Sequence, residues 1–323
     1  MNFTAPTESA TRHFLNDGMA AHSIADQIVE ARRCTVQMQN GFLYLDALAS
    51  PATALLGYDR PAPEAIDKRG LMRTLSKLHR EYKCVALDTG AEAMVPIAKQ
   101  IAATIGGNGQ GPRVVNAAAG EPEFIGGITI ALEDETIGRS GAWLVSPAWR
   151  SKPDLIVLGS TLAAGESFGA LLMSRRAVER GSSNLQIRAA SVPAGIMALV
   201  QGVVVSVERQ QLIEHGRDLA KYFSERMNAV QAACQQIAAI RFGVLSANVR
   251  FQPGTSAGQL KRKLCERGLL VGADEQNGLV IRPPLSTRPA EIDVISGVLR
   301  GVMHGVPATR ISACCAACQD QAS

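Results

Sequence analysis

Short apolar runs of strand length alternate with helical segments through the middle of this chain, and that alternation limits the folds open to it. The strand-like runs are Val85–Leu87, Ile128–Leu132, Leu155–Leu158 and Gly169–Met173. The spacing predicts a helix over Ala91–Ile105 and a helix-rich stretch over Pro193–Ala233. Apolar strands separated by helices are typical of a mainly parallel sheet covered on both faces. The sequence therefore predicts an α/β fold.

The pattern changes towards both ends of the chain. After residue 235 it predicts strands over Ala247–Phe251 and Leu279–Arg282, each followed by a helix, over Ala257–Arg267 and Pro289–Met303. Near the start, a helix over Ser23–Arg33 precedes a hairpin that turns at Asn40 and Gly41. We therefore expect residues 61–235 to form the large α/β domain. Residues 1–60 join a small α+β domain formed by 236–308, and 309–323 form a flexible tail.

Composition excludes several classes of protein. The chain has 323 residues, of which 46% are apolar and 19% charged, so it can bury a full core without crosslinks. The net charge of +4 is scattered along the chain, which disfavours a nucleic-acid-binding protein. The longest apolar stretch, Ile196–Val205, is too short to span a membrane, and the first 17 residues lack a secretory apolar core. We expect a cytoplasmic protein.

The cysteines and histidines predict no metal site. Seven cysteines, with no export signal, suit a reducing compartment. The tail carries Cys314, Cys315 and Cys318, but a zinc site needs four ligands and the nearest histidine is His304. We expect free thiols in a frayed tail rather than a zinc site.

Three places carry residues suited to ligand binding. Thr89, Gly90 and Ala91 form a turn between a strand and a helix, where backbone N–H groups favour a phosphate, although such turns are common. Asp134 follows a strand and is either a ligand-binding carboxylate or part of an exposed acidic turn. Arg282 precedes two prolines at a strand end and is either a carboxylate anchor or a surface ion-pair partner.

Read in order, these segments resemble the class III aminotransferases of the fold-type I pyridoxal-phosphate family along most of the chain. Thr89–Ala93 is similar to the family's "SGAEA" phosphate-binding turn, and Gly138–Gly141 to its "GRTG" segment. Pro153–Ile156 resembles the "PDI" strand, and Arg282–Leu285 the "RxxPPL" carboxylate-binding segment. The resemblance implies a shortened PLP-transferase-like fold that works as a homodimer or as a heterodimer with an active paralogue.

The resemblance also assigns individual residues. The family's "LGKALGGG" segment reads Leu158–Gly165 here and puts Ser160 on the lysine that holds pyridoxal phosphate. A phosphate-binding threonine of the family falls near Arg188. The partner of the pyridine nitrogen is Ala131 in an ungapped alignment and Asp134 in a gapped one, of which Asp134 is favoured.

These departures predict a catalytically degenerate protein, because a serine hydroxyl neither forms an imine nor acts well as a base. We expect a binding or complex-forming subunit. The alternative is altered chemistry on pyridoxal phosphate or another phosphorylated ligand held noncovalently between Gly90, Ala91 and Arg188, with Arg282 holding the carboxylate of a small ligand. An active transaminase that uses a displaced lysine ranks third. The orientation of that amine carries much of the rate, and a displaced lysine would lose it.

Overall fold

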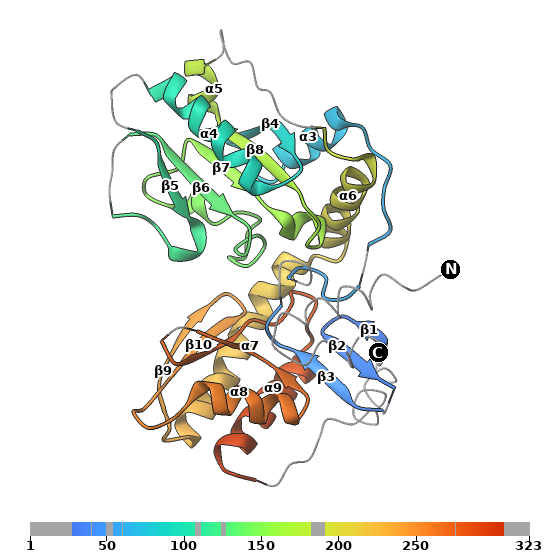
Figure 1. The fold of residues 1–323 in the computed structure, drawn as a ribbon, viewed down its shortest axis with the longest axis vertical. Helices are drawn as coiled ribbons and strands as arrows, with labels where there is room; N and C mark the ends of the chain where they lie inside the picture. The colour runs from blue at the N-terminus through green and yellow to red at the C-terminus, as the bar shows by residue number, and fades with distance from the viewer. Residues whose placement is uncertain are drawn as a thin grey trace. The chain divides into compact units, whose positions relative to one another are not determined.

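The computed structural model describes residues 28–39, 41–49, 54–59, 61–106, 111–123, 127–181, 191–274 and 276–306. The chain divides into two compact units (Figure 1). The central unit is Pro61–Ile213, and the terminal unit combines Met1–Arg60 with Glu214–Ser323. The sequence-based expectation placed the second boundary at residue 235, whereas the structural division assigns nearly all of one long helix to the terminal unit.

The central unit holds a five-stranded sheet of order β4-β8-β7-β6-β5. Its strands are β4 (Tyr82–Asp88), β5 (Arg113–Asn116), β6 (Thr129–Glu133), β7 (Leu155–Leu158) and β8 (Gly169–Ser174). β8 is antiparallel to both of its neighbours, so β4, β5, β6 and β7 share one direction. The predicted α/β fold with a mainly parallel sheet is confirmed.

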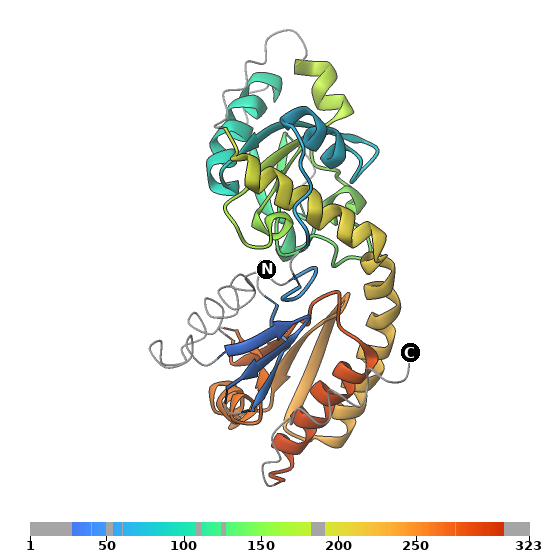
Figure 2. The ribbon, with the colours of Figure 1, turned by 90° about the vertical axis from the view of Figure 1, so that its right-hand side faces the viewer.

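Helices cover both faces of this sheet (Figures 1 and 2). They are α3 (Lys68–Ser76), α4 (Ala91–Gly106), α5 (Arg175–Gly181) and α6 (Ala194–Arg209). Met94, Ala98 and Ile101 of α4 pack on apolar side chains of β6, β7 and β8 and form a hydrophobic core with them. α3 and α6 contact each other on the other face. The apolar runs identified in the sequence are buried because both faces of the sheet are covered.

The terminal unit contains two four-stranded sheets, of order β1-β2-β3-β11 and β12-β13-β10-β9. The strands are β1 (Ile28–Arg32), β2 (Thr35–Met38), β3 (Leu43–Asp46), β9 (Ile237–Gly243), β10 (Ser246–Phe251), β11 (Leu269–Leu270), β12 (Gly272–Ala273) and β13 (Gly278–Ile281). The helices are α7 (Leu212–Ala233), α8 (Ala257–Glu266) and α9 (Pro289–Met303). Tyr222 and Arg226 of α7 both bind Asp293 of α9, at 2.6 and 2.8 Å.

One predicted helix is wrong where it can be checked. Ile28–Arg32 is strand β1, which pairs antiparallel with β2, and not the end of a helix over Ser23–Arg33. Ile28 and Ala31 do share a helical spacing, but Arg33 adopts a φ of 50° and turns the chain back on itself. Residues 23–27 lie outside the described part of the chain. The hairpin predicted after this segment is confirmed as β2 and β3.

Among the described residues, no single helix is long and apolar enough to cross a membrane, and only α6 and α7 together, as a bent pair, meet that standard. The same part of the chain contains no group of three or more histidine, cysteine or acidic side chains arranged to hold a metal ion. Cys314, Cys315 and Cys318 lie outside the described residues.

A close backbone approach at Gly169 gives the first testable prediction. A Cβ atom on Gly169 would lie 2.4 Å from the carbonyl oxygen of Gly90, so Gly169→Ala overpacks the start of β8. We expect a loss of about 1–3 kcal/mol in the free energy of unfolding, measured by urea denaturation. Gly195→Ala in the first turn of α6 is the control, because nothing lies within 4 Å of its Cβ position. Equal stability of the two variants would contradict the prediction.

Candidate functional site

The candidate site lies where four strands of the central sheet end. β4, β5, β6 and β7 run in one direction, so their carboxyl ends, at Asp88, Asn116, Glu133 and Leu158, meet at one edge of the sheet. In open α/β sheets ligands bind outside this edge. Thr89, Asp134 and Ser160 each follow one of these strand ends, so the structure brings three of the predicted site residues to the same edge.

The turn from β4 to α4 has the geometry that the sequence predicted. Ala91 opens α4, whose first backbone N–H groups lack partners within the helix and favour an anion. A Cβ on Gly90 would meet nothing within 4 Å, so the turn opens into free space on that side. The turn packs closely against Gly169 at the start of β8, an approach that is possible because Gly169 has no side chain.

Sequence reasoning missed the carboxylate beside this turn. Asp88 is 4% exposed, and its Oδ1 accepts hydrogen bonds from the backbone N–H of Thr89 at 2.7 Å and from the Thr89 hydroxyl at 3.2 Å. Two donors of the turn therefore already serve a carboxylate. A phosphate placed here would also be repelled by the charge of Asp88. In the sequence Asp88 is only the last residue of a buried strand, and nothing in that pattern distinguishes its carboxylate from any other strand end.

Asp134 and Ser160 contact each other directly. Oδ2 of Asp134 accepts a hydrogen bond from the Ser160 hydroxyl at 3.1 Å, and Oδ1 accepts one from the backbone N–H of Thr161 at 2.7 Å. Both oxygens of Asp134 are thus engaged by the turn that carries Ser160. A Cβ on Gly159 would lie 2.4 Å from the Asp134 carboxyl carbon, so the carboxyl group lies on the bare backbone of Gly159.

The two residues that the alignments offered as the partner of the pyridine nitrogen, Asp134 and Ala131, lie in different surroundings. Asp134 is half-buried immediately after β6, at the edge where the other site residues lie. Ala131 is fully buried inside β6, paired with Ile156 of β7, and carries no polar group. Of the two positions, Asp134 alone presents a carboxylate at the site edge.

Glu133 is a second carboxylate that sequence reasoning did not single out as functional. It is fully buried at the end of β6. Its oxygens accept hydrogen bonds from the backbone N–H groups of Val145 and Ser146, from the Ser146 hydroxyl at 2.6 Å and from the Thr136 hydroxyl at 2.9 Å. These hydrogen bonds attach the loop between β6 and β7 to the end of β6.

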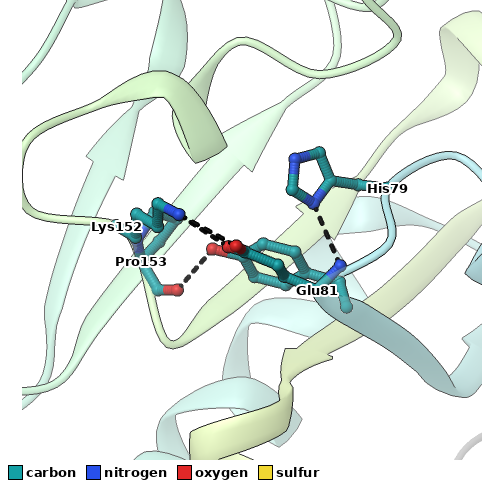
Figure 3. A network of polar contacts seen from close by, with 5 residues as sticks. His79, Glu81, Lys152 and Pro153 are labelled. Carbon is teal, nitrogen blue, oxygen red and sulfur yellow. Dashed lines mark hydrogen bonds and ion pairs between the residues drawn. The ribbon is translucent and has the colours of Figure 1, made fainter.

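Lys152 lies at the opposite edge of the same sheet. Its Nζ is 2.8 and 3.0 Å from the two carboxylate oxygens of Glu81, as Figure 3 shows. Glu81 precedes β4 and Thr89 follows it, and a strand of this length spans about 20 Å at roughly 3.3 Å per residue. Lys152 is therefore too far from the candidate site for its amine to act beside Ser160.

Of the two predicted arginines, the structure describes Arg282. Arg282 follows β13 in the terminal unit, where it is half-buried and its backbone N–H donates to the carbonyl oxygen of Ala47. Arg188 lies outside the described residues. The geometry of the site at the sheet edge thus rests on Asp88, Thr89, Asp134 and Ser160.

Comparison with known proteins identifies one family model and several curated relatives that match this chain. The family model described as Aminotransferase class-III matches residues 133–303. The alanine/serine racemase of Pyrococcus horikoshii is 24% identical over 169 residues, which are 49% of this chain and 35% of the racemase. The acetylornithine aminotransferase of Aquifex aeolicus is 25% identical over 167 residues, 52% of this chain and 42% of that enzyme. The aligned part is less than half the length of each relative.

Solved structures agree with this chain in fold. Ornithine delta-aminotransferase of Plasmodium falciparum superimposes with a TM-score of 0.71 at 14% identity, covering 93% of this chain and 98% of that one. A phospholyase from Arthrobacter, solved with phosphoethanolamine, gives 0.69 at 16% identity, covering 92% and 100%. At such low identity these matches show the fold alone.

The buried carboxylate of Glu133 provides the prediction for this region. Glu133→Gln replaces one accepting oxygen with an NH₂ group that faces N–H donors, so buried donors lose their partner. We expect a loss of about 1–3 kcal/mol in the free energy of unfolding, measured by chemical denaturation. Glu92→Gln on the exposed side of α4 is the control with the same change of charge. An unchanged stability for Glu133→Gln would show that its hydrogen bonds are dispensable.

Proposed function

The chain belongs to the class-III aminotransferase family, and on that premise we propose that it does not transaminate and instead acts as a binding or complex-forming subunit. One observation carries this proposal. At the position where family resemblance puts the cofactor-binding lysine, Ser160 donates a hydrogen bond to Asp134. Loss of a positioned general base alone costs on the order of 10²–10⁴ in rate.

The residues present do not fit covalently held pyridoxal phosphate. The amine that would form the imine is replaced by the hydroxyl of Ser160, which donates a hydrogen bond to Asp134. Asp88 adds a negative charge at the turn where the phosphate would lie. Lys152, which could have offered an alternative amine, pairs with Glu81 at the far edge. We therefore derive no catalytic step through this cofactor.

A second candidate is noncovalent binding of pyridoxal phosphate or another phosphorylated ligand. The turn at Gly90 and Ala91 favours it, because the N-terminus of a helix favours an anion and a Cβ on Gly90 would meet nothing within 4 Å. In this reading Arg188 binds the phosphate and Arg282 holds a carboxylate of the ligand, as the family resemblance implies. Such a ligand would have to outweigh the repulsion from Asp88.

Assembly with a second chain is also part of the proposal. The family resemblance supports a homodimer, or a heterodimer with an active paralogue, in the cytoplasm. Size-exclusion chromatography with light scattering measures the mass in solution and distinguishes a dimer from a monomer. A monomer that also fails to co-purify with a paralogue would contradict the complex-forming role.

The decisive experiment asks whether any lysine captures the cofactor. Pyridoxal phosphate is titrated into the protein while its absorbance spectrum is recorded, and borohydride reduction and peptide mass mapping follow. We expect no imine band and no modified lysine in the natural chain. A stoichiometric adduct on one lysine would refute the proposal and identify a relocated catalytic residue.

The variant Ser160→Lys separates the two candidates. If the phosphate-binding half of the site survives, this variant gains a trapped adduct at position 160 and the noncovalent reading is supported. If it gains none, the binding-subunit reading is supported. Thr104→Lys on the exposed side of α4 is the matched control, because it adds a lysine away from the site edge.

A further inference from the structure

A pocket lies at the edge of the central sheet opposite Ser160. It is about 650 Å³ in volume, within the range of small-molecule sites. Its walls come from the residues before β4 and β7 and from those that end β8 and begin α5. Its charged and aromatic lining residues are Glu81, Tyr82, Arg150, Lys152, Arg175 and Arg176. All of them belong to the central unit, so the pocket lies within one compact body.

The charge in this pocket is strongly unbalanced. Arg150, Lys152, Arg175 and Arg176 all line it, against Glu81 as its one lining carboxylate. Lys152 is paired with Glu81 at 2.8 Å, and Arg176 is paired at 2.7 Å with Asp154 beneath the surface. Within the part of the chain that the structure describes, Arg150 and Arg175 have no hydrogen-bond or ion-pair partner for their side chains. Two guanidinium groups therefore face the same hollow without a counter-charge.

The pocket wall is held in place by hydrogen bonds. The Tyr82 hydroxyl donates to the carbonyl oxygen of Pro153 at 2.7 Å. Burial raises the pKa of Tyr82, so the hydroxyl remains a donor at neutral pH. The backbone N–H of Arg175 donates to the carbonyl oxygen of Glu81 at 3.0 Å, which ties the start of α5 to the segment before β4. The cations are thus carried on fixed backbone, while their side chains are exposed and free to close on a ligand.

The paired carboxylate of Glu81 is held in its charged form. The hydrogen bond from Lys152, with the adjacent positive charge, lowers the pKa of Glu81 (Figure 3). This pairing occupies the amine of Lys152, so Glu81 competes with any anion for it. Removal of the charge on Glu81 would release a third cation to the pocket.

We propose that this pocket binds a small organic phosphate, with Arg150 and Arg175 holding the phosphate group. A guanidinium matches phosphate oxygens with two parallel hydrogen bonds, and two unpaired guanidinium groups match the double charge of a phosphate monoester. The aromatic ring of Tyr82 and the ring of Pro153 supply an apolar wall for the organic part. This site is separate from the proposed function, because it lies about 20 Å along β4 from the Ser160 edge.

The test measures binding of pyrophosphate and of glycerol phosphate by isothermal titration calorimetry at low ionic strength. We expect saturable binding of one molecule per chain that weakens as salt rises, because the cations are exposed. Arg150→Gln combined with Arg175→Gln should weaken binding by on the order of tenfold or more. No saturable binding of either probe to the natural chain would overturn the proposal.

Matched variants separate this site from general positive charge. Arg69→Gln combined with Lys99→Gln removes two exposed cations elsewhere in the central unit and should leave binding unchanged. Equal weakening by both double variants would overturn the proposal. Thr89→Asp adds a carboxylate at the other edge and should also have no effect. Loss of binding in Thr89→Asp would overturn the proposal, because it would show that the ligand binds at the α4 turn.

A gain of affinity guards against loss through misfolding. Glu81→Gln frees Lys152 and should tighten binding severalfold, a result that a damaged protein would not give. Glu208→Gln on the exposed side of α6 removes the same charge away from the pocket and is expected to have no effect. Unchanged or weaker binding in Glu81→Gln would contradict the role given to Lys152. Binding of pyrophosphate without glycerol phosphate would contradict an organic ligand.

Discussion

The parallel register between β6 and β7 determines the geometry of the whole candidate site. Glu133 lies opposite Leu158, so the two strands end together and the next residues, Asp134 and Gly159, meet at the edge of the sheet. All four residues of β7 are buried, and each of them pairs with a residue of β6. The contact between Asp134 and Ser160 follows from that register.

Two adjacent carboxylates perform different tasks because side chains alternate along a strand. Glu133 points into the protein and is satisfied by donors from the loop that follows, whereas Asp134 points to the edge and binds the Ser160 turn. The first stabilises the loop and the second holds the turn. Each oxygen of Asp134 accepts a hydrogen bond from the turn that carries Ser160, so this carboxylate helps to fix the turn in place.

The sequence predicted those parts of the fold that depend on local periodicity. The four apolar runs of the central unit and the helix after Gly90 were predicted because burial on both faces leaves long unbroken apolar patterns. β1 was mistaken for a helix because its two buried residues, Ile28 and Ala31, are three residues apart, as on a helix face, with an irregularity in strand pairing between Ile28 and Glu30. Asp88 and Glu133 were missed because their partners are set by the path of turns and loops, which no period reveals. The basic pocket joins three separate segments, residues 81–82, 150–153 and 174–176, so no single stretch of sequence indicated it.

The bare backbone at Gly159 limits how this site could change over evolutionary time. Any other residue there would push its first side-chain carbon into the carboxyl group of Asp134. The two positions are therefore epistatic: a larger residue at 159 becomes acceptable only after 134 has shrunk or moved. As long as Asp134 remains, glycine must remain too. A lysine introduced at position 160 would then lie next to the present pair of neighbours only if both Gly159 and Asp134 were kept.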